Sequence, residues 1–183
     1  DDPAYTGTAW SFDGGDFLLG PTTAMWSNTA GMTVLCIANP TRTSNAYIAS
    51  QYSTSSKRSW QLVGKAFHVQ EVATTADADM IATLATGFSE GVVQFGAGRW
   101  KPGTAAQIIR GNFVETATAA KVVNDITDAS AALVLGSNAD KGAFYSGSTL
   151  LVAIYTRYLV DAEISRAYHY LKSLMASRGV TVA

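Results

Sequence analysis

Residues 150–179 read L-L-V-A-I-Y-T-R-Y-L-V-D-A-E-I-S-R-A-Y-H-Y-L-K-S-L-M-A-S-R-G and predict an apolar strand followed by an amphipathic helix. Asp161 and Glu163 lie in the expected first turn of this helix, and Arg178 and Gly179 mark its expected last turn and C-cap. Between these ends, apolar side chains recur every three or four residues, which places them on one helix face. They are Ile164, Ala167, Tyr168, Leu171, Leu174 and Met175. No other helix is specified firmly by the sequence.

The rest of the chain reads as short strands joined by turns. Apolar runs recur at spacings of about eight to twelve residues, which is typical of a β-sandwich or jelly roll. The clearest expected strands are residues 32–38, 47–52, 60–63 and 66–72. Residues 8–19 read as two strands around the turn Asp13–Asp16, and residues 96–103 read as a loop.

Composition supports the same fold and excludes several functions. A chain of 183 residues fits one domain, and Ala, Thr, Ser, Gly and Val are its dominant residues. Only 15% of the residues are charged and the net charge is −1, which argues against a nucleic-acid-binding surface. No apolar run approaches the roughly twenty residues that cross a bilayer, so no membrane partner is expected. We therefore predict an all-β, two-sheet antiparallel jelly-roll sandwich with one C-terminal helix, as a single domain over residues 1–183.

The single cysteine and the first residue give little information about function. Cys36 has no partner for a disulfide within the chain and lies in an apolar run, which predicts a buried core thiol. The chain begins at Asp1 rather than Met, which is expected of a processed or trimmed product.

Several segments occur in an order that resembles a known family. They are S-F-D-G-G-D-F-L (11–18), M-T-V-L-C-I-A-N-P (32–40), W-Q-L (60–62), L-V-L-G-S (133–137) and Y-S-G-S-T-L-L-V-A-I-Y-T-R-Y-L-V-D-A-E-I (145–164), followed by the closing helix. Together they resemble a laminin-G-like domain of the concanavalin A-like jelly-roll superfamily, although residues 74–123 match only loosely. The resemblance implies two face-to-face sheets with a short helix at one edge. Similar domains are found in secreted glycan-binding proteins and on bacteriophage structural proteins.

Catalytic motifs are weak in this sequence. Residues 87–91, G-F-S-E-G, match the G-x-S-x-G pattern of a nucleophile elbow, but a strand rather than a helix is expected after them. Glucanases of the resembling superfamily carry E-x-D-x-x-E on one strand, and this chain has no such pattern. Its glutamates are scattered, at Glu71, Glu90, Glu115 and Glu163. We therefore predict that the chain is not an enzyme, with a glycoside hydrolase as a distant third alternative.

Calcium is the one cofactor that the sequence leaves open. Carboxylate and carbonyl oxygens from flexible loops are the ligands that calcium prefers. Candidate ligands from turns are Asp13, Asp16, Asn138 and Asp140. The alternative is that these residues form turns and cap local amides. Zinc is not expected, because His68 and His169 are isolated and His68 alternates with apolar residues toward solvent.

A glycan site would use exposed aromatic rings, on which sugar rings stack. Trp100 is the first candidate, since Arg99, Lys101 and a proline flank it in the expected loop. The alternative for Trp100 is a side chain folded back over the edge of the sandwich. Weaker candidates of the same kind are Trp26, Tyr52 and Tyr145, whereas Trp10 and Trp60 are expected in the core.

These observations predict a non-catalytic recognition or assembly module. The first version is a phage virion surface component, such as a capsid decoration, head-fibre or tail-associated protein. It would have protein partners in a larger assembly, with a homotrimer as one arrangement, and would contact host glycans. The alternative is a secreted carbohydrate-binding, lectin-like module. The predicted location is accordingly the virion surface or the extracellular space. Low charge and the lack of disulfides and of usable N-x-S/T sites favour the virion version.

Overall fold

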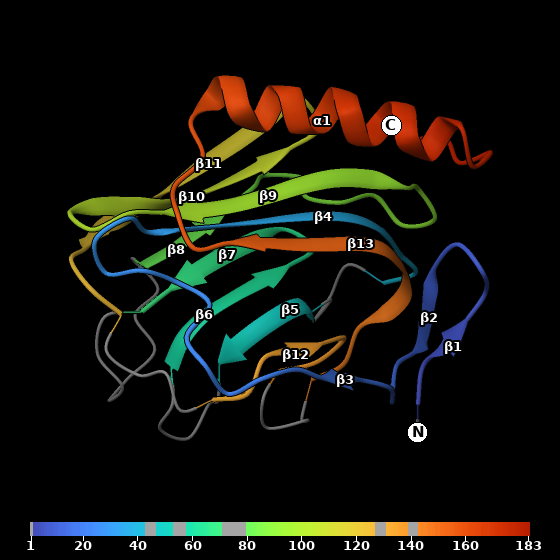
Figure 1. Cartoon of the computed structure of the whole chain (residues 1–183), viewed down its shortest axis with the longest axis horizontal. Coiled ribbons are helices and arrows are strands. Elements are labelled where there is room, and N and C mark those ends of the chain that lie inside the picture. The colour runs from blue at the N-terminus through green and yellow to red at the C-terminus, as the bar shows by residue number, and fades with distance from the viewer. Residues whose placement is uncertain (1, 43–46, 53–57, 71–79, 127–130, 139–142) are drawn as a thin grey trace.

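The computed structural model describes residues 2–42, 47–52, 58–70, 80–126, 131–138 and 143–183, which form two antiparallel sheets and one helix (Figure 1). The seven-stranded sheet contains, in spatial order, β1 (Ala4–Tyr5), β2 (Trp10–Asp13), β13 (Ser146–Tyr155), β4 (Met32–Pro40), β9 (Gln94–Trp100), β10 (Thr104–Arg110) and β11 (Glu115–Val123). The six-stranded sheet contains β3 (Leu18–Leu19), β12 (Val134–Leu135), β5 (Tyr47–Tyr52), β6 (Arg58–Val63), β7 (Ala66–Val69) and β8 (Ile81–Thr83). Helix α1 (Asp161–Ala176) follows β13. The predicted β-sandwich with one C-terminal helix is confirmed.

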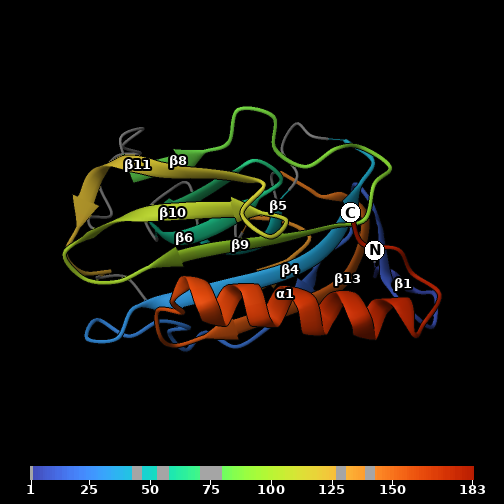
Figure 2. The same ribbon diagram turned by 90° about the horizontal axis from the view of Figure 1, so that it is seen from above.

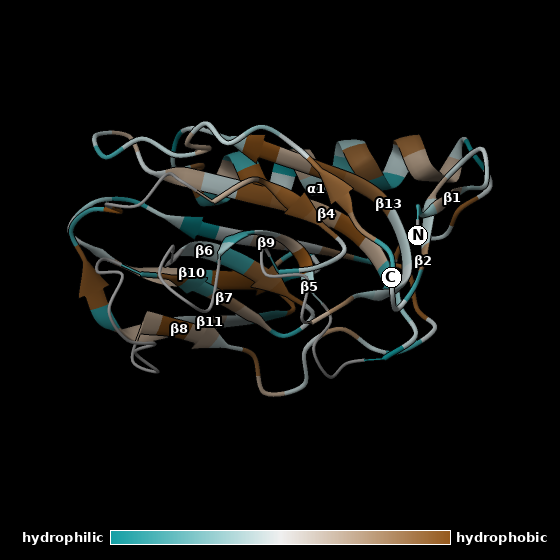
Figure 3. Ribbon diagram, turned by 90° about the horizontal axis from the view of Figure 1, so that it is seen from below, coloured by the Kyte–Doolittle hydropathy of each residue, from teal (hydrophilic) through white to brown (hydrophobic). Residues whose placement is uncertain are grey.

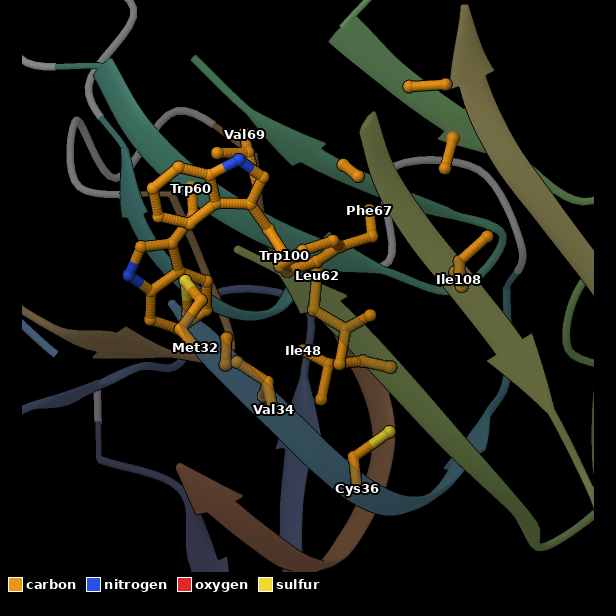
Figure 4. Close-up of a cluster of buried hydrophobic side chains, with 14 of the residues drawn as sticks. Met32, Val34, Cys36, Ile48, Trp60, Leu62, Phe67, Val69, Trp100 and Ile108 are labelled. Carbon is orange, nitrogen blue, oxygen red and sulfur yellow. The ribbon is translucent and has the colours of Figure 1, made fainter. Parts of the chain in front are cut away.

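The two sheets enclose one core of large side chains. Trp60 and Phe67 of the six-stranded sheet and Val34 and Trp100 of the seven-stranded sheet point into it and are fully buried (Figure 4). Burial of a side chain of this size stabilises a fold by about 1.5–3 kcal/mol. Gly98 of β9 matters for this packing, because a methyl group at that position would collide with the Phe67 ring. The core therefore depends on a bare backbone in β9 as well as on large apolar residues.

Strand β4 is buried on both of its faces. Val34 and Cys36 point into the sandwich core, whereas Leu35 and Ile37 belong to a second apolar cluster on the other side of the sheet. This explains why β4 reads as a continuous apolar run rather than an alternating one, and Figure 3 shows it as a hydrophobic strand. The molecule consequently has three layers, two sheets and a helix.

Helix α1 forms the third layer and lies across the outer face of the seven-stranded sheet (Figure 2). Its buried residues are Ile164, Tyr168, Leu171 and Met175, which are four of the six predicted apolar positions. They pack against side chains of β4, β9 and β10. The resemblance implied a short helix at one edge of the sheets, and this placement is wrong. The helix lies on a sheet face instead, where it buries Leu35 and Ile37 of β4.

Both ends of α1 are fixed by specific contacts. At the start, the Glu163 carboxylate accepts the Val160 amide at 2.9 Å, as an acid in the first turn should. At the end, Gly179 adopts a φ of +76° and the Val180 amide donates to the Met175 carbonyl at 2.9 Å. Arg178 lies beyond the last helical residue, so its predicted place in the last turn is wrong.

Three other local predictions differ from the structure. Strands β2 and β3 do not pair with each other, because the turn Asp13–Asp16 carries the chain from one sheet to the other. Residues 96–103 are mostly strand: β9 continues to Trp100 and turns directly into β10. Trp10 is 39% exposed rather than in the core, and its ring lies 5.0 Å from that of Tyr5.

Candidate functional site

The outer face of the six-stranded sheet carries a group of polar side chains. Trp60, Leu62 and Phe67 point into the core, so alternation along β6 and β7 places their neighbours on the opposite face. The strand register aligns these neighbours with residues of β5. The members are Tyr47, Ser50, Tyr52, Ser59, Gln61, His68 and Gln70, which we call the polar face.

Much of the polar face is withdrawn from solvent. Ser59, His68 and Gln70 are buried, as are Ser50 and Tyr52 of β5. His68 thus faces away from the core as predicted, but its predicted exposure to solvent is wrong. Burying polar groups is costly unless they are hydrogen-bonded, so side chains of this kind are held in fixed positions.

Named contacts join the strands of the polar face. The Ser50 hydroxyl donates to the Ser137 carbonyl at 2.9 Å. The rings of Tyr52 and His68 are 5.2 Å apart, and Gln61 Nε2 lies 3.4 Å from His68 Nδ1. Within the described residues, Gln61 Oε1 is buried without a hydrogen-bond partner. The polar face therefore holds one buried amide oxygen whose hydrogen-bonding capacity is not used by the described residues.

Tyr47 and Gln61 form the partly open part of the polar face, since both are half-buried. Tyr47 is paired with Val63, two residues along β6 from Gln61. Burial raises the pKa of the Tyr47 hydroxyl above its ordinary value, so this group stays neutral at physiological pH. Its ring supplies a flat apolar surface and its hydroxyl can donate or accept a hydrogen bond.

Two of the four glutamates, Glu115 and Glu163, have structural contacts in the described part of the chain. The polar face contains amide, hydroxyl and imidazole groups and no acid. Glu115 accepts hydrogen bonds from Thr86 and Arg110, and Glu163 is paired with Arg157. Glycoside hydrolysis needs two carboxylates that converge on one cleft, and these two serve structural contacts instead. Glu71 lies outside the described residues.

The G-x-S-x-G pattern forms a turn. Gly87 and Gly91 have φ values of +72° and +71°, and the strand β9 follows them. A nucleophile elbow needs a helix directly after the serine, so the prediction of a plain turn is confirmed.

Two of the calcium candidates, Asp13 and Asp16, lie in one turn between β2 and β3. The Asp13 carboxylate accepts the Gly15 amide at 2.9 Å, and the Asp16 carboxylate accepts the Asp13 amide at 3.0 Å. The segment of residues 136–138 approaches them, because a methyl group at Gly136 would stand 3.2 Å from the Asp16 carbonyl oxygen. The carboxylates of Asp13 and Asp16 thus have the local capping role of the alternative, and each also retains one oxygen that these amides do not use. Asp140 lies outside the described residues. Calcium binding by the four candidate residues therefore stays a prediction.

Trp100 is not an exposed anchor. It is fully buried, and its indole N–H donates to the Val123 carbonyl at 3.0 Å. The alternative of a ring folded over the edge of the sandwich is right about burial but not about place, because the ring lies in the core between the sheets. The reason is that β9 extends through Trp100, which the flanking glycines of the sequence concealed.

Arg99 is also buried and serves the helix. Its guanidinium lies 2.6 Å from the Asp161 carboxylate, donates to the Leu159 carbonyl at 2.9 Å, and stacks 4.6 Å from the centre of the Tyr158 ring. These contacts fasten the start of α1 to β9. Arg99 therefore positions a structural element, and its predicted exposure beside a ligand is wrong.

The other aromatic candidates are buried as well. Trp26 donates its indole N–H to the Ile126 carbonyl at 3.3 Å, and the Tyr145 hydroxyl donates to Ser148 at 3.0 Å. Only Tyr52 among the predicted ligand residues belongs to the polar face. Sequence reasoning missed Tyr47 and Gln61, although the alternation of polar and apolar residues in β6 could have placed Gln61 opposite the core.

Comparison with known proteins establishes the fold. No family model matches the chain, and no curated protein does. Among solved structures, the CBM40 of Ruminococcus gnavus IT-sialidase bound to α2,3-sialyllactose matches with a TM-score of 0.60 and 12% identity, over 87% of this chain and 96% of that module. The receptor-binding domain of the botulinum neurotoxin C/D mosaic serotype gives 0.65 and 12%, over 93% of this chain and 45% of that one.

A third likeness is to domain 4 of AbnA, an extracellular GH43 arabinanase from Geobacillus stearothermophilus, in complex with arabinotriose. Its TM-score is 0.56 at 14% identity, over 90% of this chain and 78% of that domain. The chain spans under half of the botulinum structure but nearly all of the CBM40 module. Helix α1, the one helix among the described residues, is not long and apolar enough to cross a membrane. The shared architecture is a jelly-roll β-sandwich, of the kind found in carbohydrate-binding modules.

Proposed function

We propose that the chain is a non-catalytic glycan-binding module that binds sugars at the polar face. The observation that carries this proposal is the half-buried pair of Tyr47 and Gln61 on a sheet face otherwise lined with buried polar side chains. A sugar ring would stack on Tyr47 while its hydroxyls bond the Gln61 amide. The likeness to modules solved with sialyllactose and arabinotriose supports this choice of ligand.

The chemistry of the polar face suits sugars better than charged ligands. Sugar hydroxyls both donate and accept hydrogen bonds, and amide, hydroxyl and imidazole groups match them in both directions. Gln61 is half-buried, so part of its side chain remains open to a sugar hydroxyl, whereas its Oε1 is buried. Strand positions hold such groups more rigidly than loops do, which lowers the entropy cost of binding.

The test is a glycan array followed by calorimetry with the best ligand, with α2,3-sialyllactose and arabinotriose as the first probes. We expect Tyr47→Ala and Gln61→Ala to weaken binding, and a cooperative unfolding transition in each variant confirms that it remains folded at the assay temperature. Tyr170→Ala is the matched control, because it removes an exposed ring on α1, against the other sheet. Retained binding in both polar-face variants would contradict the proposed site, and an array without any hit would contradict the function.

The finer role of a virion surface component rests on the sequence resemblance and the low charge. In that role the protein would sit in a larger assembly, for which a homotrimer is the simplest arrangement. Native mass spectrometry of material from the source tests it: a trimer or a megadalton particle supports the virion role, and a free monomer favours a secreted module.

Calcium binding at Asp13, Asp16, Asn138 and Asp140 is a separate proposal. It predicts that calcium raises the thermal midpoint and that a chelator reverses the rise. An unchanged midpoint would contradict the site.

A further inference from the structure

A groove runs between helix α1 and strand β13, on the outer face of the seven-stranded sheet. Its volume is about 420 Å³, within the range of sites that take small ligands or single large side chains. The floor is aliphatic and is formed by Leu35, Leu151, Ala153, Leu159 and Leu171. This groove and the polar face lie on different sheets.

The rim of the groove is aromatic and charged. Tyr155 and Tyr170 border it and are 38% and 66% exposed. Val160, which follows the floor residue Leu159, is 52% exposed. Tyr155 and Tyr170 are two of the nine exposed large apolar side chains among the described residues, and Val160 stands next to the groove in sequence. Exposed apolar side chains beside an apolar groove are typical of an interaction site.

The charges at the rim do not cancel. Arg157 and Glu163 form a two-point ion pair with distances of 2.8 Å and 3.0 Å, and Glu163 also accepts the Val160 amide. Arg166 lies on the same rim, and its charge adds to that of Arg157 in lowering the pKa of Glu163. Two guanidiniums therefore share one carboxylate at this rim, which leaves one positive charge in excess beside the aliphatic floor.

We propose that this groove docks a protein segment in which a large apolar side chain stands next to a carboxylate. The apolar side chain would fill the aliphatic floor and the carboxylate would pair with Arg166. Tyrosine and arginine are the residues that dominate the energy of protein interfaces, and they form most of this rim. A sugar is a poor fit for the floor, because five aliphatic side chains leave its hydroxyls without partners.

The experiment uses three acetylated and amidated pentapeptides, G-F-L-D-G, G-F-L-K-G and G-S-S-D-G, titrated to millimolar concentration. Amide chemical shifts of the full chain report where each peptide binds. We expect G-F-L-D-G to shift amides of residues 151–157 and 163–171, and the other two to leave them nearly unchanged. The Arg166→Glu variant should weaken the response by about two- to fivefold, the range of an exposed ion pair. Arg178→Glu is the matched control, since it reverses an exposed charge beyond the helix end.

Three results would overturn the proposal. The first is no shift at the groove with G-F-L-D-G, and the second is an equal response to G-F-L-K-G. The third is a response to sodium dodecanoate but not to the peptide, which would assign the groove to a lipid-like ligand. Because Arg166 and Tyr170 are exposed, their variants should fold, and an unchanged unfolding midpoint confirms this.

Discussion

Glu115 links the two sheets where their open edges meet, and its contacts predict a specific pH dependence of stability. It begins β11 in one sheet, and Thr86 follows β8 in the other. The Thr86 amide and hydroxyl donate to its two carboxylate oxygens at 2.8 Å and 2.6 Å, and Arg110 Nε donates at 3.0 Å. Partial burial raises the pKa of Glu115, but these hydrogen bonds outweigh it and lower the pKa to about 2.

The magnitude follows from this pKa. A value of about 2 lies well below the ordinary 4.5, and each unit of difference between folded and unfolded states corresponds to about 1.4 kcal/mol. The upper limit is therefore about 3.5 kcal/mol, which partial exposure to solvent reduces toward about 2 kcal/mol. Because the folded-state pKa is lowered, this stability is complete above the unfolded pKa. It is lost as the pH falls from about 5 to about 2.

The assay is urea unfolding of the wild type and of Glu115→Gln at pH 7 and at pH 2.5. We expect the variant to be less stable by about 2 kcal/mol at pH 7, with most of this difference gone at pH 2.5. Asp2→Asn is the control, because Asp2 is an exposed acid at the start of the chain. A difference that is equal at both pH values would refute the reasoning. It would show that Glu115 stabilises the fold through shape rather than through its charge.

Three further predictions concern the core. Gly98→Ala should lower the free energy of unfolding by about 1–3 kcal/mol, because the added methyl group displaces the Phe67 ring; urea titration measures it. Burial raises the pKa of Cys36 to about 12, so a thiol reagent should modify it only after unfolding; fast labelling of the native protein at pH 8 would contradict this. Trp100→Phe should cost about 2–4 kcal/mol, since it opens a cavity and leaves the Val123 carbonyl without its indole donor. A thermal midpoint like that of the wild type would argue against it.

The fold was predictable because its signals are local. The stripe of Ile164, Tyr168, Leu171 and Met175 predicts a helix from spacing alone, and the hairpin across Gly64 and Lys65 follows from two apolar runs and a turn. Boundaries and pairings were less predictable. Nothing near Asp13 in the sequence says that the chain changes sheets there, because that choice depends on β12 and β13 far along the chain.

The candidate site was harder to predict than the fold because exposure is a tertiary property. Trp100 stands among glycines and charged residues, yet its backbone pairs with Met32 and its ring enters the core. Gln61 alternates with buried residues, as an ordinary solvent-facing strand residue does, and only the register with Ser50 and His68 reveals a polar face. Sequence reasoning could therefore name aromatic candidates but could not tell which of them the folded chain buries.

The burial of β4 on both faces explains why the outer faces of the two sheets differ. Because Leu35 and Ile37 need cover, α1 must lie on the seven-stranded sheet, and Arg99 fixes its start there. A single helix covers only part of that face, so an aliphatic groove remains beside β13. The six-stranded sheet has no helix against it in the described part of the chain, which leaves its outer face to polar side chains. The apolar groove and the polar face thus lie on different sheets. The protein segment and the glycan that we propose as their ligands would therefore not compete.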